Sequence, residues 1–333
     1  MTRLRSSRRI LLALLRLGVG VGLLVYLAKS KIIDFHTLSR LAAEWPVSLA
    51  AMVFLFVDMA LMAWRLCFLF RPQGMRFRWI DSLQLTSISA FFATFLPGRA
   101  GGDLAKIFYA AKEKSGRRTE IVTVLLFDRS MGLFSLLLLP LLLAPMFPEL
   151  LRSPSVRIAL SIAGILALAM LAGFFLCIFA PVWVNRLAGR PCRLLNASPF
   201  AGRFIAAVGA YGRSPCTVAG ALGISLVDNL LGVGVVALAL FVVHPSGLEA
   251  KLCVVAPLGQ IVNSLPLTPG GLGVGETAFH TLFGIAGLKG GAEAMLCWRI
   301  WNAMIGVFGL ILYVRGFRTR ILNGPSGLAG VSP

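Results

Sequence analysis

Long apolar runs, separated by short polar or basic segments, occupy almost the whole chain of 333 residues. A helix needs about 20 predominantly apolar residues to cross a hydrocarbon core about 30 Å thick, so each longer run is a candidate transmembrane helix. The pattern predicts an all-α, polytopic integral membrane protein with about six full transmembrane helices. We place these helices at residues 10–28, 47–70, 121–146, 156–184, 216–243 and 292–314.

The first apolar run follows a basic start, so it could be a signal peptide or a first membrane helix. It is too long for a typical signal-peptide core, contains Arg16 and lacks a small-x-small cleavage motif. We therefore interpret it as an uncleaved helix with a cytoplasmic N-terminus. We expect one transmembrane domain over residues 1–322, followed by a disordered cytoplasmic tail over 323–333, which is rich in Gly, Ser and Pro.

Two further apolar stretches are interrupted. The run 82–96 is short, and basic segments lie on both sides of it, at 71–78 and 99–118. Both basic segments can be cytoplasmic only if the chain between them enters the membrane and returns on the same side. In the second half, 252–267 and 277–288 are separated by prolines and glycines, and neither is comfortably long enough to span. The sequence predicts two broken, re-entrant hairpins entered from opposite sides, as in an inverted-repeat transporter.

The residues at these breaks allow two interpretations. Non-helical backbone at membrane depth is tolerated where it lines a cavity, and glycines let backbone amides approach a ligand there. The alternative is that the glycines permit tight turns and close helix packing. We favour the ligand role only where prolines cluster with charges. The candidate break residues are Pro97, Gly98, Gly101, Gly102, Pro266, Pro269, Gly270, Gly271, Gly273 and Gly275.

Composition narrows the class of protein. Hydrophobic residues make up 58% of the chain and charged residues 14%, yet the net charge is +19. The basic residues cluster between apolar runs, which is the positive-inside pattern, so we expect cytoplasmic loops and termini and no nucleic-acid partner. The six cysteines and three histidines are scattered without metal-ligand spacing, and there is no Walker motif. We therefore expect no metal site, no other cofactor and no direct use of ATP.

Charges inside the apolar regions suggest a polar cavity. If a helix restarts after Pro97, then Arg99, Asp103 and Lys106 lie on one face at i, i+4 and i+7. Charges at this depth cost at least about 2.5 kcal/mol each, so partners are expected. We call these three residues the charged ladder and expect Asp128 to pair with it. The adjacent Arg129 is expected to pair with an acidic residue in the second half of the chain. The predicted cavity and headgroup-binding residues are Arg99, Asp103, Lys106, Asp128, Arg129, Glu276 and Arg299.

Other polar residues within the apolar runs allow interpretations that do not involve the cavity. Asp58 and Asp228 could bond to neighbouring helices or contact a ligand, and both alternatives stay open. Arg16 and Arg65 lie near helix ends, so we expect their guanidinium groups to extend to the membrane surface.

Three segments resemble a known family: Leu-Pro-Gly-Arg-Ala-Gly-Gly-Asp at 96–103, the pair Asp128-Arg129, and Pro-Leu-Thr-Pro-Gly-Gly-Leu-Gly-Val-Gly-Glu at 266–276. They resemble the lysylphosphatidylglycerol synthase transmembrane-region family, the flippase-like domain, over about residues 10–320. The family includes the translocating half of the multiple peptide resistance factor and proteins linked to hopanoid lipids. The resemblance implies a bacterial inner-membrane protein with re-entrant helices that moves a lipid between leaflets.

The sequence also departs from this family. Many members carry Glu-Arg where this chain has Asp128-Arg129, and bifunctional members continue into a cytosolic aminoacyltransferase domain, whereas this sequence ends at Pro333. Lysyl transfer by the chain alone is therefore not expected. We favour a lipid translocase over a membrane-embedded transferase or a non-catalytic scaffold. The expected partners are anionic or lipid-linked membrane lipids, a separately encoded lipid-modifying enzyme and further copies of the chain.

Overall fold

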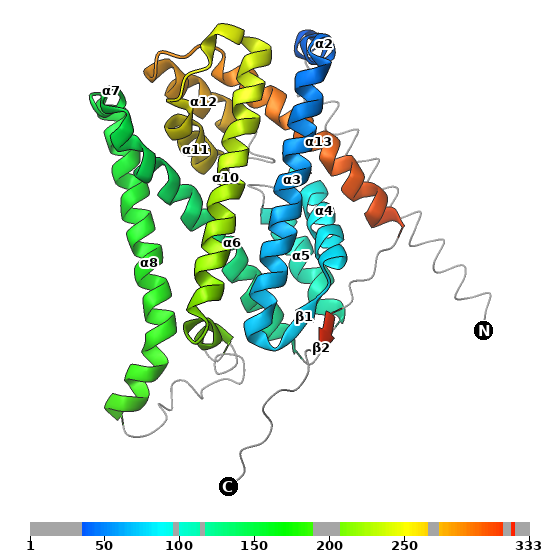
Figure 1. The fold of residues 1–333 in the computed structure, drawn as a ribbon, viewed down its shortest axis with the longest axis vertical. Helices are drawn as coiled ribbons and strands as arrows, with labels where there is room; N and C mark the ends of the chain where they lie inside the picture. Colours follow the sequence, from blue (N-terminus) through cyan, green and yellow to red (C-terminus); the bar gives the residue numbers. More distant parts are fainter. Residues whose placement is uncertain are drawn as a thin grey trace, which may run out of the picture.

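The computed structural model describes residues 35–95, 100–113, 117–188, 207–265, 273–315 and 321–323 (Figure 1). In this part of the chain, five helices are long and apolar enough to cross a membrane. They are α3 (Trp45–Phe70), α6 (Arg118–Leu143), α8 (Pro154–Ala188), α10 (Pro215–Val243) and α13 (Gly291–Val314). The predicted all-α, polytopic membrane fold is confirmed, and each helix matches a predicted run. The sixth predicted helix, 10–28, lies outside the described residues.

Short elements connect the spans. Helix α2 (Phe35–Ala43) precedes α3, and α7 (Pro148–Leu151) joins α6 to α8. Single 3-10 turns lie at Arg71–Gln73, Ala144–Met146 and Pro245–Gly247. Strand β1 (Met75–Phe77) pairs antiparallel with β2 (Ile321–Asn323), so Met75 lies opposite Asn323. Asn323 thus belongs to a strand, and the rest of the predicted tail, 324–333, lies outside the described residues.

Both interrupted stretches form helical hairpins with short arms. Helix α4 (Trp79–Phe95) packs against α5 (Ala100–Glu113), and α11 (Leu252–Asn263) packs against α12 (Val274–Ile285). None of the four reaches the length of the five spans, because the Gly- and Pro-rich breaks divide the apolar runs. The connecting segments 96–99 and 266–272 lie outside the described residues. They contain seven predicted residues: Pro97, Gly98, Arg99, Pro266, Pro269, Gly270 and Gly271.

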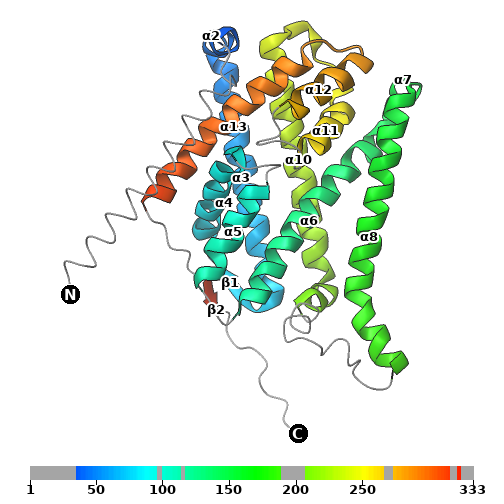
Figure 2. The same cartoon turned by 180° about the vertical axis from the view of Figure 1, so that it is seen from behind.

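The two hairpins lie toward opposite ends of the bundle, as Figures 1 and 2 both show. The order span, hairpin, span occurs twice, first as α3, α4–α5, α6 and then as α10, α11–α12, α13. Helices α3 and α10 run in opposite directions and pack together. The first arm of each hairpin packs against the last span of the other half, α4 on α13 and α11 on α6. This arrangement is the one expected of an inverted repeat.

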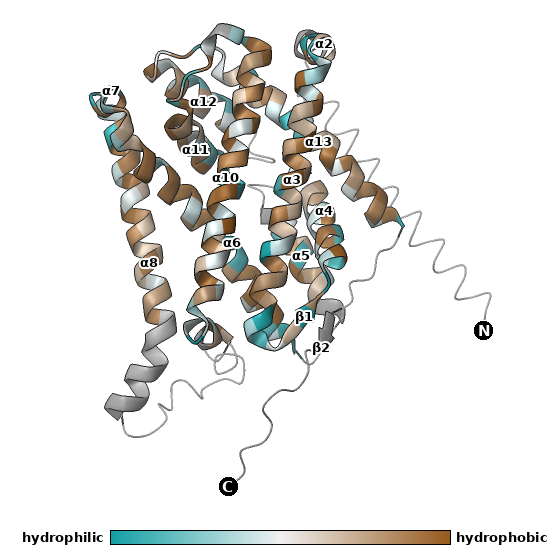
Figure 3. Cartoon of the chain, in the orientation of Figure 1, coloured by the Kyte–Doolittle hydropathy of each residue, from teal (hydrophilic) through white to brown (hydrophobic). Residues whose placement is uncertain are grey.

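Hydropathy along the bundle suits a position across a membrane. Apolar residues cover most of the long helices, and hydrophilic ones gather where α3 ends beside β1 (Figure 3). Helix α8 stands at the side of the bundle, packed mainly on α6, and exposes apolar residues such as Ile158, Ile165 and Leu168. Exposed apolar side chains suit contact with lipid tails. The two larger cavities described next both lie beside α8.

Candidate functional site

Arg65 of α3 is the centre of a buried charge network. Its Nε donates to Oδ1 of Asp128 on α6 at 2.7 Å, and its Nη1 donates to Oγ of Ser225 on α10 at 2.8 Å. Oδ2 of Asp228 lies 3.9 Å from Nη1. The expectation that Arg65 extends to the membrane surface is wrong, because only 4% of the residue is exposed. Helices α6 and α10 bring their polar groups to this guanidinium of α3, and the packing of the three helices buries it.

Asp128 also has a partner on the first hairpin. Nζ of Lys106 lies 3.9 Å from Asp128 Oδ2, so the predicted pairing of Asp128 with the ladder on α5 is present in the structure. Arg65 is nevertheless the closer cation, at 2.7 Å. A buried carboxylate is held in its charged form when it accepts such charge-assisted bonds. Asp128 therefore connects the core of the bundle to the first hairpin.

Arg129 pairs within the first half of the chain. Its Nε lies 3.3 Å from Oδ2 of Asp103, and about a third of each side chain is exposed. The prediction that Arg129 pairs with an acid of the second half is wrong. The reason is that α5 packs directly against α6, which brings Asp103, one helical turn before Lys106, beside Arg129.

These charges line one wall of a cavity of about 580 Å³ between α5, α6, α8 and α11. Among the described lining residues, Asp103, Lys106 and Arg129 are the charged ones. The rest of the lining is apolar except for Ser264, and consists of Leu104, Ile107, Leu125, Leu126, Leu133, Leu137, Leu166, Met170, Ile261, Ser264 and Leu265. A cavity with one charged wall and otherwise apolar sides matches an amphiphile, whose ends differ in the same way.

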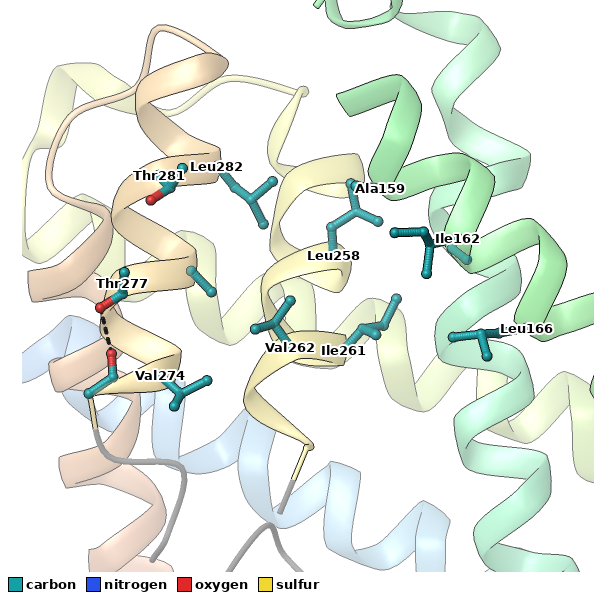
Figure 4. A pocket seen from close by; sticks show the side chains of 13 residues that line it. Ala159, Ile162, Leu166, Leu258, Ile261, Val262, Val274, Thr277, Thr281 and Leu282 are labelled. Carbon is teal, nitrogen blue, oxygen red and sulfur yellow. Dashed lines mark hydrogen bonds between the residues drawn. The ribbon is translucent and has the colours of Figure 1, made fainter. Parts of the chain in front are cut away.

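A second cavity of about 730 Å³ adjoins the first, between α8, α11 and α12 (Figure 4). Its described lining is apolar apart from Thr277 and Thr281, and Oγ1 of Thr277 donates to the Gly273 carbonyl at 2.7 Å. Leu166 and Ile261 belong to the linings of both cavities. The two volumes are therefore neighbours, and together they follow the side of the bundle that α8 covers.

The second hairpin carries its own ion pair. Arg299 of α13 donates from Nε to Glu276 Oε1 at 2.5 Å and from Nη2 to Asn263 Oδ1 at 3.1 Å. Glu276 Oε2 also accepts from the backbone N–H of Gly273 at 2.8 Å. Gly273 has φ +78°, a conformation that favours glycine, and it is the N-cap residue directly before α12. The structure thus brings the predicted residues Glu276 and Arg299 together, joining α11, α12 and α13.

Two glycines at the breaks permit close packing. A Cβ on Gly102 would lie 2.6 Å from the Ser89 carbonyl oxygen and 2.9 Å from Ala93 Cβ. A Cβ on Gly275 would lie 2.6 Å from Asn263 Oδ1 and 2.7 Å from Arg299. Gly102 therefore allows the close packing of α5 on α4. This agrees with the helix-packing interpretation of the glycines and not with the ligand-binding one. Gly101 is buried beside it, and Gly275 makes room for the Arg299 ion pair.

Sequence reasoning missed Arg65 and Ser225, and it left the role of Asp228 open. One signal was available, because Asp58 and Arg65 lie seven residues apart and share a face of α3. Two ionisable residues on one face of an apolar helix indicate a polar interior. The acceptors from α6 and α10 depend on tertiary contacts that no local pattern encodes.

The spans, hairpins and buried ion pairs define the class of protein, a polytopic α-helical membrane protein with a polar interior. The family model for the lysylphosphatidylglycerol synthase TM region matches residues 13–312, so the chain belongs to that family. No curated protein and no solved structure matches the chain. Membership assigns the chain to membrane proteins of lipid metabolism or translocation.

Proposed function

We propose that this protein is a lipid translocase, which moves an anionic or lipid-linked amphiphile between the leaflets. The observation that carries the proposal is the pair of adjoining cavities, whose described lining is mostly apolar and has its only charges at the wall of Asp103, Lys106 and Arg129. A headgroup at that wall would leave its tails against apolar side chains. Transfer of a lipid headgroup through the membrane is slow chiefly because the polar group must lose its hydration, and a charged wall replaces that hydration.

Arg129 is the best-placed group to receive a phosphate. Its partner Asp103 is 3.3 Å away, and both side chains are about a third exposed, so the pair is accessible from the cavity. An arginine binds phosphate through two parallel N–H···O bonds, which can replace one loose contact with a carboxylate. Lys106, already turned toward Asp128, adds a second positive charge at the same wall.

The two hairpins offer a means of alternating access. They lie toward opposite ends of the bundle, and each carries an ion pair to a spanning helix, Asp103–Arg129 in the first and Glu276–Arg299 in the second. Opening one pair while the other stays closed would expose the cavities to one side at a time. We assign the end that holds Arg71, Arg76 and Arg117 to the cytoplasm of a bacterial inner membrane, by the positive-inside rule.

The test is lipid movement in liposomes that contain the purified protein. We expect labelled phosphatidylglycerol, or the native lipid extract, to reach the opposite leaflet faster than in protein-free vesicles. Arg129→Ala should reduce the rate at least about tenfold, since a charge-assisted bond contributes about 1.5–3 kcal/mol, and Arg129→Lys should keep part of it. Arg157→Ala, on the exposed surface of α8, is the matched control. Equal rates with and without protein would refute the proposal.

The lipid itself is best identified in cells. Comparison of outer-leaflet lipids with and without the protein should show one lipid class depleted or enriched, without assuming a mechanism. Complementation by Arg129→Ala would instead favour a scaffolding role for a lipid-modifying enzyme. Formation of a modified lipid by the isolated chain would favour the transferase.

A further inference from the structure

A third cavity lies in the centre of the bundle, apart from the two larger cavities. It measures about 70 Å³ and is lined by residues of α3, α6, α10, α11 and α13. It shares no lining residue with the larger cavities. Helix α11 separates them, with Gln260 in the inner lining and the next residue, Ile261, in both outer linings. The volume exceeds the roughly 10–15 Å³ that a water molecule needs, so it can hold a hydrated ion or waters.

The inner cavity is rich in oxygen atoms. Its polar lining residues are Asp58, Asp228, Asn229, Gln260 and Asn302, and no described lining residue is a cation. Asn229 donates its amide N–H groups to Ser135 Oγ at 2.7 Å and to the Ser225 carbonyl at 2.9 Å. Asn302 donates to the Trp298 carbonyl at 2.8 Å. These bonds use the NH2 groups and leave both carbonyl oxygens available as acceptors.

Asp228 is the group in this cavity that needs a partner. The residue is 5% exposed, and its Oδ1 has no hydrogen-bond partner among the described residues. Its other oxygen is 3.9 Å from Arg65, whose guanidinium is bonded more closely to Asp128, at 2.7 Å. A buried carboxylate oxygen without a donor is costly, by about 1–3 kcal/mol or more for a charged group. Asp58 lies within hydrogen-bonding reach of Asp228, so a proton shared by the two carboxyl groups, or a cation between them, would relieve that cost.

The charged groups around Asp228 come from three helices. Asp58 and Arg65 of α3 and Asp128 of α6 interact with it, and Lys106 of α5 reaches Asp128. From α11 and α13 the described cavity lining contributes the amides of Gln260 and Asn302 and no ionisable side chain. Two carboxylates that share a low-dielectric site do not both stay ionised unless a cation lies between them. Asp58 and Asp228 therefore need one additional positive charge between them.

We propose that Asp228 and Asp58, with the amide oxygens of the inner cavity, bind one exchangeable monovalent cation, a proton or a sodium ion, that drives lipid movement. The cation-binding part stands on the geometry alone, and the coupling part rests on the proposed translocase function. An all-oxygen donor set suits a hard cation. The same carboxyl pair can instead share one proton.

The buried network links this cavity to the lipid site. Arg65 divides its charge between Asp228 and Asp128, and Asp128 is also paired with Lys106, which lines the cavity with the charged wall. When a cation neutralises Asp228, Arg65 can bind Asp128 fully and Lys106 is released toward a headgroup. When the cation leaves, Asp228 attracts Arg65, and Asp128 holds Lys106. Binding or release of one cation at Asp228 therefore changes the charge that the cavity wall presents to the lipid headgroup.

The binding test uses the purified full-length protein in nanodiscs of phosphatidylcholine and phosphatidylglycerol. If the cation is sodium, the melting temperature rises with NaCl, saturably, and not with N-methylglucamine chloride. If it is a proton, the infrared carbonyl band of a protonated carboxyl group is present near neutral pH and disappears as pH rises. Asp228→Asn should abolish either signal, and Glu293→Gln, an exposed acid of α13, should keep it. Neither signal in the wild-type protein would overturn the proposal.

A second variant protects the test against misfolding. Asp58→Asn removes the other carboxylate of the pair, so it should also lose the signal even if Asp228→Asn does not fold. A full signal in a folded Asp58→Asn or Asp228→Asn protein would assign the cation to another site and overturn the proposal.

The coupling test imposes a tenfold gradient of the identified cation across proteoliposomes. With one cation per lipid, the gradient should drive a lipid asymmetry of up to about tenfold, because equal free energies give equal concentration ratios. Lipid movement that ignores the gradient would refute the coupling and leave the translocase function intact. Absence of all lipid movement would refute the translocase function, whereas the cation-binding result would stand by itself.

Discussion

Replacement of Arg65 by methionine tests whether the buried network holds the bundle together. Methionine keeps a long unbranched side chain but removes the guanidinium, its 2.7 Å bond to Asp128 and its bond to Ser225. Asp128 would keep Lys106 at 3.9 Å, while Asp228 would lose its nearest cation. Breaking a buried ion pair on one side costs about 3–5 kcal/mol. Since one cation remains near Asp128, we expect the lower end of this range, about 3 kcal/mol.

The assay is equilibrium unfolding in mixed detergent micelles with increasing dodecyl sulfate, followed by tryptophan fluorescence. Combining Arg65→Met with Asp228→Asn should restore about 1–3 kcal/mol, because the second change removes the carboxylate left without a cation. Arg157→Met, on the exposed face of α8, should change the free energy of unfolding by less than about 0.5 kcal/mol. A cost below about 1 kcal/mol for Arg65→Met, or no recovery in the double variant, would refute the reasoning.

Three further changes test the packing and the outer loops. Gly275→Ala should cost about 1–3 kcal/mol, because the methyl group would overlap the arginine and asparagine beside it, whereas Gly284→Ala, with open space around it, should be neutral in the same unfolding assay. Gly102→Ala should destabilise similarly by pushing α5 from α4, and retention of the wild-type melting temperature would contradict this. Hydrogen bonds from Lys251 to Glu149 and a second glutamate raise the pKa of Lys251, so their small stabilisation should be present at neutral pH and fall as pH rises past the usual lysine range. Lys251→Met should remove that pH dependence from the melting temperature.

Hydropathy alone predicted most of the fold. The run 216–243 became α10, Pro215–Val243, nearly residue for residue, because about 30 Å of hydrocarbon demands a continuous apolar helix. The first hairpin followed from charge, since two basic segments could not flank one complete crossing. Spacing along a helix also predicted that Asp128 would pair with the ladder, through Lys106.

Prediction failed where neighbours are far apart in the chain. Arg65 pairs with Asp128 across 63 positions, and the packing of α3 on α6 and α10 decides this contact. Because Arg65 lies five residues before the end of α3, the sequence favoured a guanidinium group at the membrane surface. In the structure, neighbouring parts of the chain bury that end of α3. Arg129 was given a partner in the wrong half because the sequence did not show that α5 returns directly beside α6.

The packing of each hairpin on the other half has a consequence for synthesis of the protein. Helix α4 is covered by α13, where Phe92 lies 5.2 Å from Tyr313 between ring centroids. The ribosome makes α4 long before α13, and the buried Phe91 of α4 stacks on Tyr313 of α13. Until the last span is made, the face of α4 that packs on α13 has no partner from that helix. The packing of the first hairpin is therefore completed only after α13 has been made, although the sequence of the hairpin precedes α13 by almost 200 residues.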